Sequence, residues 1–121
     1  MAKLLVVDDE SSIRLLYAQE LAEDGHDVTT AASAAEAAEK LSQGSFDLVV
    51  LDIKLKNESG LDLLQKIVKE RHEMPVILCT AFSFYKDDFS AWLADGYVVK
   101  SSDLTELKEE IKRVLAKKRQ V

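Results

Sequence analysis

Five polar residues of this 121-residue chain stand directly after short apolar runs. Asp8 and Asp9 follow "LLVV", Asp52 follows "LVVL", Thr80 follows "VILC" and Lys100 follows "YVV". Carboxylates that come close together repel one another and raise their pKa values unless a cation lies among them. Lys100 can supply one positive charge, and Mg²⁺, which prefers carboxylates, a backbone carbonyl and waters, can supply two more. A carboxylate nucleophile, a metal, a lysine and a hydroxyl are the groups that phosphoryl transfer requires.

Each of these residues also has a purely structural explanation. An Asp just after a strand is often the N-cap of the next helix, a Thr is common in strands, and a Lys at a strand end can simply reach water. The placement nevertheless recurs at the ends of four apolar runs, which favours a shared site. If those runs are parallel strands, their carboxyl ends lie at one edge of the sheet, where open α/β folds bind ligands. We therefore expect the five side chains to converge.

The elements that must position these residues are predicted by an alternation along the chain. Segments with helical spacing of apolar residues separate short apolar or β-branched runs at residues 4–7, 27–31, 46–51, 76–79 and 97–99. Continuous rather than alternating apolar strands are typical of a parallel sheet with helices on both faces. We predict an α/β fold, a flavodoxin-like (βα)5 doubly wound parallel sheet with strand order 2-1-3-4-5, in which the polar second run forms an edge.

Five helices are expected between and after these strands. Gly25 ends the first helix, and Ser33 with Glu36 at capping-box spacing begins the second. The second helix ends near Gly44, and Pro75 ends the third before the next strand. The apolar residues that mark the first, third, fourth and fifth helices are Ile13, Leu16, Tyr17 and Leu21; Leu61, Leu64, Ile67 and Val68; Tyr85, Phe89, Trp92 and Leu93; and Leu104, Leu107, Ile111, Val114 and Leu115.

The composition limits the classes of partner. The formal net charge is −6, from 16 Lys and Arg against 22 Asp and Glu, which argues against binding to nucleic acid or to an anionic membrane. No apolar stretch reaches the roughly 18 residues of a membrane span and the N-terminus has no secretory signal pattern, so we expect a cytoplasmic protein. The single cysteine, Cys79, lies in an apolar run and is expected in the core. We expect one domain, residues 1–121, with no output domain in this chain.

At the strand ends, the sequence resembles the response-regulator receiver domain of two-component signalling, and the match covers nearly the whole chain. The matching motifs are "VVDDE", "LVVLD" ending in Asp52, "SGLDLL", Thr80, and Lys100 preceded by Tyr97. The resemblance implies a signalling receiver whose Asp52 accepts a phosphoryl group from a histidine kinase or a phosphotransfer protein. The receiver then changes conformation to bind a partner. The resemblance implies no enzymatic activity beyond assistance to its own phosphorylation and dephosphorylation.

The same resemblance implies a magnesium site. The side chains of Asp9 and Asp52 and the backbone carbonyl of Lys54 would bind Mg²⁺, with Asp8 acting through water. These are the hard oxygen donors that this ion prefers.

The resemblance also implies roles in switching. Lys100 would contact the phosphoryl group, and Thr80 and Tyr97 would form the switch pair, because an acyl phosphate adds acceptors that draw the Thr80 hydroxyl inward and leave space for the Tyr97 ring. Tyr97 could instead be an aromatic residue of an edge strand that covers the core. Lys54 and Phe82, each two residues beyond a site residue, would tune the lifetime of the phosphoryl group. The face made by the fourth helix, fifth strand and fifth helix would bind a downstream protein.

The sequence departs from the family pattern at two places beside the site. The loop after Asp52 reads "IKLKNESG", without the usual methionine-proline pair but with Gly60 retained. Ser101 stands where receivers usually have a proline after a cis peptide bond. Because a cis bond before a residue other than proline costs about 2.5 to 4 kcal/mol, we expect the Lys100–Ser101 bond to be trans.

Three other functions are compatible with parts of the sequence. A haloacid-dehalogenase-like phosphatase also combines an aspartate nucleophile, Mg²⁺, a Thr and a Lys, but its two aspartates are two positions apart whereas Asp8 and Asp9 are adjacent. A flavodoxin-like cofactor carrier would have a Gly/Ser/Thr-rich phosphate loop after the first strand, and this chain has none. A receiver-like domain could also signal without phosphorylation, through an altered geometry.

Overall fold

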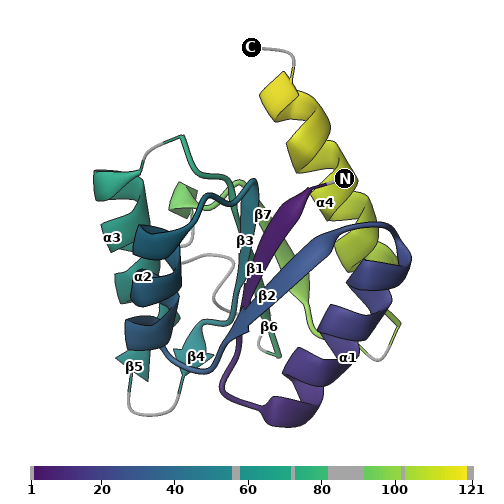
Figure 1. Ribbon diagram of the computed structural model, residues 1–121, viewed down its shortest axis with the longest axis horizontal. Coiled ribbons are helices and arrows are strands. Elements are labelled where there is room, and N and C mark those ends of the chain that lie inside the picture. The colour runs from purple at the N-terminus through teal and green to yellow at the C-terminus, as the bar shows by residue number, and fades with distance from the viewer. Residues whose placement is uncertain (1, 56–57, 72, 82–91, 102, 120–121) are drawn as a thin grey trace.

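The computed structural model describes residues 2–55, 58–71, 73–81, 92–101 and 103–119. One parallel sheet in that part of the chain (Figure 1) contains β1 (Lys3–Val7), β2 (Asp27–Ala31), β3 (Leu48–Leu51), β6 (Val76–Thr80) and β7 (Gly96–Val99). The order β2-β1-β3-β6-β7 is the predicted order 2-1-3-4-5 when these strands are counted along the chain, and β2 lies at an edge as expected. The prediction of a flavodoxin-like α/β fold is confirmed.

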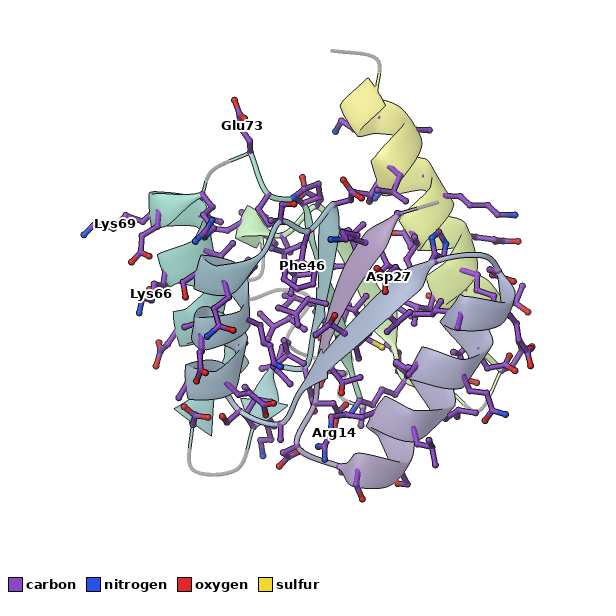
Figure 2. All side chains as sticks on the ribbon, in the orientation of Figure 1. Arg14, Asp27, Phe46, Lys66, Lys69 and Glu73 are labelled. Atoms are coloured by element: carbon purple, nitrogen blue, oxygen red, sulfur yellow. The ribbon has the colours of Figure 1, made fainter. Side chains whose placement is uncertain are left out.

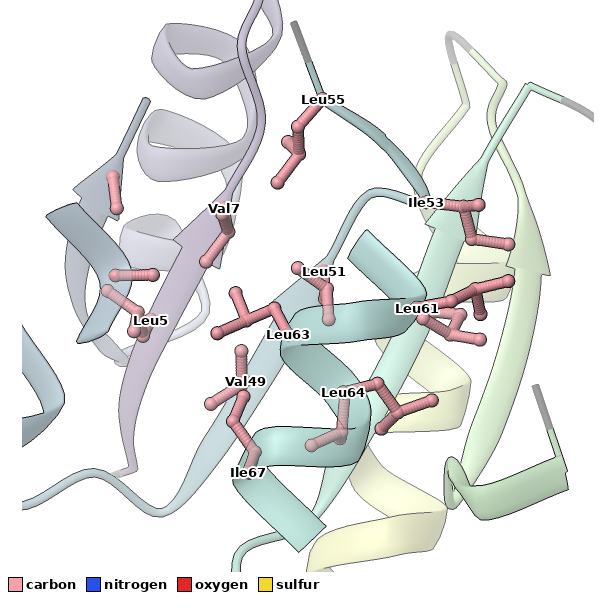
Figure 3. Close-up of a cluster of buried hydrophobic side chains, with 14 of the residues drawn as sticks. Leu5, Val7, Val49, Leu51, Ile53, Leu55, Leu61, Leu63, Leu64 and Ile67 are labelled. Atoms are coloured by element: carbon pink, nitrogen blue, oxygen red, sulfur yellow. The ribbon is translucent and has the colours of Figure 1, made fainter. Parts of the chain in front are cut away.

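Helices cover both faces of the sheet (Figure 1): α1 (Ser11–Glu23) and α4 (Thr105–Arg119) on one, and α2 (Ala34–Gln43) and α3 (Gly60–Glu70) on the other. Successive residues of a strand point to opposite faces. Leu4 and Val6 of β1 therefore pack in the cluster with α1 and α4. Leu5 and Val7 pack in the cluster with α2 and α3, which Figure 3 shows in close-up. The sheet is thus buried on both faces, which is why its strands read as continuous apolar runs.

Local sequence signals set the ends of the helices. Ser33 Oγ accepts a hydrogen bond from the N–H of Glu36 (3.1 Å), and Glu36 Oε1 accepts one from the N–H of Ala32 (2.8 Å), so the predicted caps are present at the start of α2. Gly25 follows α1 with φ 92°, in the left-handed region that glycine adopts without strain. Gly44 is the C-cap of α2, and α3 has ended before Pro75, as expected.

Several apolar residues that helical spacing assigns to the core are exposed. Leu16 is 36% exposed, Trp92 64% and Leu93 46%. On α1 the packed stripe passes through residues four apart, from Ile13 to the buried Tyr17 and Leu21, so Leu16 falls at its margin. The prediction that Leu16, Trp92 and Leu93 face the core is therefore wrong.

Three further segments differ from the prediction or lie beyond it. The predicted fourth helix falls mostly on residues 82–91, including Tyr85 and Phe89, which lie outside the described residues. β3 begins at Leu48, after the expected start at Phe46, whose ring packs partly buried against the core. A two-stranded antiparallel hairpin, β4 (Lys54–Leu55) and β5 (Glu58–Ser59), precedes α3 and was not predicted. In the part of the chain that the structure describes, no helix is long and apolar enough to cross a membrane.

Candidate functional site

The carboxyl ends of the parallel strands meet along one edge of the sheet, the lower edge in Figure 1. Asp8 follows β1, Asp52 follows β3, Thr80 is the last residue of β6 and Lys100 follows β7. Backbone hydrogen bonds continue the ladders to these residues, since the N–H of Asp52 donates to the carbonyl of Val7 (3.0 Å) and the N–H of Lys100 donates to the carbonyl of Thr80 (2.7 Å). The sheet itself therefore fixes the backbone from which the predicted site residues extend.

A lysine bridges two buried carboxylates at this edge. Lys100 Nζ lies 2.7 Å from Asp8 Oδ2 and 2.9 Å from Asp52 Oδ2. The side chains of Asp8 and Asp52 are 3% and 6% exposed, and that of Lys100 is 12% exposed. The expected convergence of these side chains is confirmed. Because both carboxylates are out of water and share one ammonium group, they favour a further positive charge at the site.

The charge states of the two partners follow from burial and from their contact. Burial raises the pKa of the Asp52 carboxyl, and the hydrogen bond and charge of Lys100 oppose that effect without cancelling it. Burial alone would lower the pKa of the Lys100 ammonium, but its hydrogen bonds to Asp8 and Asp52 outweigh burial and raise this pKa to about 12. Lys100 is therefore a cation at neutral pH, held against the carboxylates that it neutralises.

The chain also brings three consecutive acids together beside the bridge. One carboxylate oxygen from each of Asp8, Asp9 and Glu10 lies within 4.8 Å of the others. Hard oxygen donors at this spacing fit Mg²⁺ better than a softer metal. Glu10 was not among the predicted ligands, although its place in the run "DDE" could have included it.

Lys54 lies on β4, two residues beyond the phosphoacceptor candidate. Its N–H donates to Asp52 Oδ1 at 3.4 Å, and its side chain is exposed. The backbone of Lys54 therefore lies beside the Asp52 carboxylate, which is where its predicted role in metal binding requires it.

The N-terminus of α3 packs closely against the backbone of Asp52. The N–H of Gly60 donates to the carbonyl of Ile53 at 2.5 Å, and Ser59 Oγ accepts from the N–H of Leu61 at 3.2 Å. A Cβ atom on Gly60 would overlap the carbonyl oxygen of Asp52. Glycine is required here for space, so α3 supports the backbone that carries the Asp52 carboxylate.

The predicted switch residues lie on neighbouring strands. Thr80 is fully buried at the end of β6 and pairs with Val99, while Tyr97 pairs with Leu78 one register step earlier and packs partly buried against the core. Their roles in switching remain predictions. Phe82, the second predicted lifetime residue, lies outside the described residues.

The peptide bond between Lys100 and Ser101 is trans, since no bond among the described residues is cis, and that prediction is confirmed. Ser101 Oγ accepts a hydrogen bond from the N–H of Asp103 at 3.2 Å. The serine thus helps to shape the turn that leads to α4.

Sequence reasoning missed one basic residue at this edge. Arg14, in the first turns of α1, donates from Nη1 to the backbone carbonyl of Asp8 at 2.7 Å. The only signal in the sequence is its spacing of six residues from Asp8, which places a helical side chain near the preceding loop.

Comparison with known families and structures gives a consistent result. The response regulator receiver domain matches residues 4–112 of the chain. The chain is similar to the response regulator TrrA of Thermotoga maritima in a crystal structure with Mg²⁺ and BeF, with 46% identity, a TM-score of 0.91, and coverage of 94% of this chain and 99% of that one. A structure of the histidine kinase ThkA in complex with TrrA matches with 46% identity, a TM-score of 0.89, and coverage of 95% and 99%.

Curated relatives are longer proteins. The chain is 37% identical over 117 residues to the DNA-binding transcriptional regulator NtrC of Rhizobium meliloti, and 35% identical over 115 residues to the two-component response regulator PhoP of Pseudomonas aeruginosa. These matches take in 95% and 93% of this chain but only 24% of NtrC and 51% of PhoP.

Proposed function

This chain belongs to the response regulator receiver domain family, and from that membership we propose that it is a signalling receiver phosphorylated on Asp52. The observation that carries the proposal is the bridge at the sheet edge, where Lys100 Nζ lies 2.7 Å from Asp8 and 2.9 Å from Asp52 between buried carboxylates. A buried carboxylate beside a fixed cation has the nucleophile and the charge neutraliser that phosphoryl transfer needs. Its donor would be a phosphorylated histidine of a histidine kinase or a phosphotransfer protein.

In the proposed step, a carboxylate oxygen of Asp52 forms a bond to phosphorus as the bond between phosphorus and the donor's imidazole nitrogen breaks. The ammonium of Lys100 holds one phosphoryl oxygen, and the hydroxyl of Thr80 donates to another. Drawing the Thr80 hydroxyl toward the phosphoryl group biases the packing around Tyr97, which is how the signal leaves the site.

The donor set fits Mg²⁺, because it consists of carboxylates and a peptide carbonyl close to the Asp8, Asp9 and Glu10 cluster. The ion would be held by the carboxylates of Asp9 and Asp52 and by the carbonyl of Lys54, with Asp8 acting through water. When bound, it supplies two positive charges that offset the phosphoryl oxygens. The crystal structure of TrrA with Mg²⁺ and BeF supports this assignment.

The partners follow the same reasoning. The complex of ThkA with TrrA supports a histidine kinase as the upstream partner. We assign the downstream partner to the face formed by the segment before β7, β7 and α4, which exposes Trp92, Leu93 and Val99. On this assignment the chain works in the cytoplasm through protein partners, without binding nucleic acid or membrane, and acts as no enzyme beyond its own phosphorylation and dephosphorylation.

The proposal is tested with small phosphoryl donors. Acetyl phosphate with Mg²⁺ should add one phosphoryl group to the intact protein, measured by mass spectrometry, and beryllofluoride with Mg²⁺ should shift the NMR signals of Asp52, Thr80 and Tyr97. Asp52→Asn should abolish both responses. Asp27→Asn, which changes an exposed carboxylate at the opposite end of β2, should leave both intact. An unmodified wild-type protein with unshifted spectra at millimolar ligand would contradict phosphorylation and favour signalling without it.

A further inference from the structure

Arg14 is a cation at the site to which the phosphoryl chemistry above gives no role. It lies half-buried on α1, and Figure 2 shows it at the edge of the sheet where β1 runs into α1. Its Nη1 donates to the backbone carbonyl of Asp8 at 2.7 Å, a short hydrogen bond from a charged donor. In the described part of the chain, no carboxylate forms an ion pair with Arg14, so the carbonyl is the partner that fixes its guanidinium.

Asp8 is held at every polar group, and two of the four ties come from basic side chains. Its N–H donates to the carbonyl of Ala31 (3.1 Å), its carbonyl accepts from Arg14 (2.7 Å), its Oδ1 accepts from the N–H of Glu10 (2.9 Å) and its Oδ2 binds Lys100 (2.7 Å). The backbone ties set where β1 ends. The bond from Arg14 fixes the peptide plane after Asp8, and that plane determines how the "DDE" turn presents its carboxylates.

The orientation of Asp8 bears on Asp52 through the shared lysine. Lys100 divides its contacts between Asp8 and Asp52, at 2.7 and 2.9 Å. If Asp8 turned away, the whole ammonium charge would fall on Asp52 and pair with the oxygen that must attack phosphorus. Holding Asp8 in place therefore keeps Asp52 available as a nucleophile while Lys100 stays beside it.

We propose that Arg14 is a positioning residue for phosphoryl transfer to Asp52, acting through the carbonyl of Asp8. This role rests on the proposed function, because it concerns the reactivity of the same carboxylate. It adds a residue outside the metal and phosphoryl contacts to those on which the reaction depends.

The chain contains a matched control for this interaction. Arg113 on α4 donates from Nη2 to the backbone carbonyl of Asp95 at 2.7 Å, at the amino end of β7 and hence at the opposite edge of the sheet. The two arginines therefore make the same kind of bond to a loop carbonyl, at the same length. A general loss of stability should be common to substitutions at both, whereas an effect on the site should follow Arg14 alone.

The experiment compares Arg14→Gln, Arg14→Lys and Arg113→Gln with the wild type. The first readout is the rate of phosphorylation by acetyl phosphate at saturating Mg²⁺. We expect it to fall about tenfold in Arg14→Gln, the loss typical of a charged hydrogen bond, to recover largely in Arg14→Lys and to stay unchanged in Arg113→Gln. The second readout, in metal-free protein, is amide hydrogen exchange at Glu10, whose N–H is bonded to Asp8 Oδ1. It should rise about tenfold in Arg14→Gln alone, relative to the buried amide of Val50.

The two readouts separate failure of this inference from failure of the proposed function. Wild-type rates and wild-type exchange at Glu10 in a folded Arg14→Gln protein would overturn the role of Arg14 and leave phosphorylation standing. Equal losses in Arg14→Gln and Arg113→Gln would also overturn it, since they would reflect stability. If the wild type takes up no phosphoryl group, the proposed function fails and with it the role of Arg14 in transfer, while the exchange measurement still decides whether Arg14 holds Asp8.

Discussion

Replacing Gly60 with alanine should damage the site without touching any polar group in it. Gly60 is the first residue of α3, and its N–H donates to the carbonyl of Ile53 at 2.5 Å. An added Cβ would overlap the carbonyl oxygen of Asp52 and lie 2.9 Å from both the Asp52 carbonyl carbon and Ile53 Cα. Nonbonded carbon atoms favour separations of about 3.5 to 4.0 Å, so the backbone of Asp52 and the start of α3 must move apart by roughly 1 Å.

The size of the effect follows from this displacement. Forcing extra volume into a packed site with backbone shifts typically costs about 1 to 3 kcal/mol of unfolding free energy. For a domain of this length, a loss of that size lowers the melting temperature by roughly 4 to 15 °C. The effect on chemistry should be larger, because a displacement of about 1 Å at a reacting group can slow a reaction by about 100-fold.

The assay measures both quantities on the same protein. Thermal unfolding gives the change in stability, and phosphorylation by acetyl phosphate with Mg²⁺, at a temperature where the variant is folded, gives the change in rate. Gly44→Ala is the matched control, because a Cβ there would meet nothing closer than 3.9 Å and its φ of −146° suits any residue. We expect the control to change neither the melting temperature nor the rate appreciably.

A Gly60→Ala protein with the stability and phosphorylation rate of the wild type would refute the reasoning, because the required movement would then be harmless. A lowered melting temperature with an unchanged rate would show that α3 supports the fold but does not position Asp52.

Three further predictions concern single side chains around the site. Lys100→Met keeps the aliphatic stem but leaves the carboxylates of Asp8 and Asp52 without their cation, so urea unfolding of the metal-free protein should show a loss of about 3 kcal/mol, which Mg²⁺ should partly restore; an unchanged midpoint would contradict the bridge. Burial raises the pKa of the Cys79 thiol from 9.0 to about 11, so the unfolded state loses this proton first and the unfolding free energy should fall as pH rises from 9 toward 11; the fall should be smaller in Cys79→Ala, and equal slopes would count against it. Glu58 Oε1 accepts from the N–H of Ala34 at 2.8 Å, at the positive end of α2, so Glu58→Gln should lower stability by about 0.5 kcal/mol, with the difference shrinking in high salt; a difference insensitive to salt would exclude a charge effect.

The order of the elements could be predicted from the sequence because its signals are local. Apolar runs of strand length, separated by capped helical segments, indicate a parallel sheet, and Gly25 marks a helix end that only its left-handed backbone explains. The site followed by one more step. Residues placed at the carboxyl ends of parallel strands must meet at one edge, so Asp8, Asp52 and Lys100 could be brought together without knowledge of any contact.

Features that depend on contacts between distant parts of the chain could not be predicted. Helical spacing allowed Leu16 a place in the core, but the stripe that actually packs is one residue narrower. The hairpin after Asp52 has no strong strand signal and is tied instead by Glu58 to α2 and by Leu55, which is buried among the core residues of Figure 3. Such contacts depend on how α2 and α3 stack on the sheet.

The sequence by itself determined which residues reach the functional edge, because the two-residue repeat of a strand and the shared direction of parallel strands leave no other arrangement. Only the tertiary structure decided how those residues divide their contacts. Lys100 binds Asp8 as well as Asp52, Arg14 holds the carbonyl of Asp8, and Gly60 leaves room for the Asp52 backbone. The physical reason is that hydrogen bonds and steric overlap act over distances of about 3 Å, and separations that short are set by the packing of whole helices on the sheet.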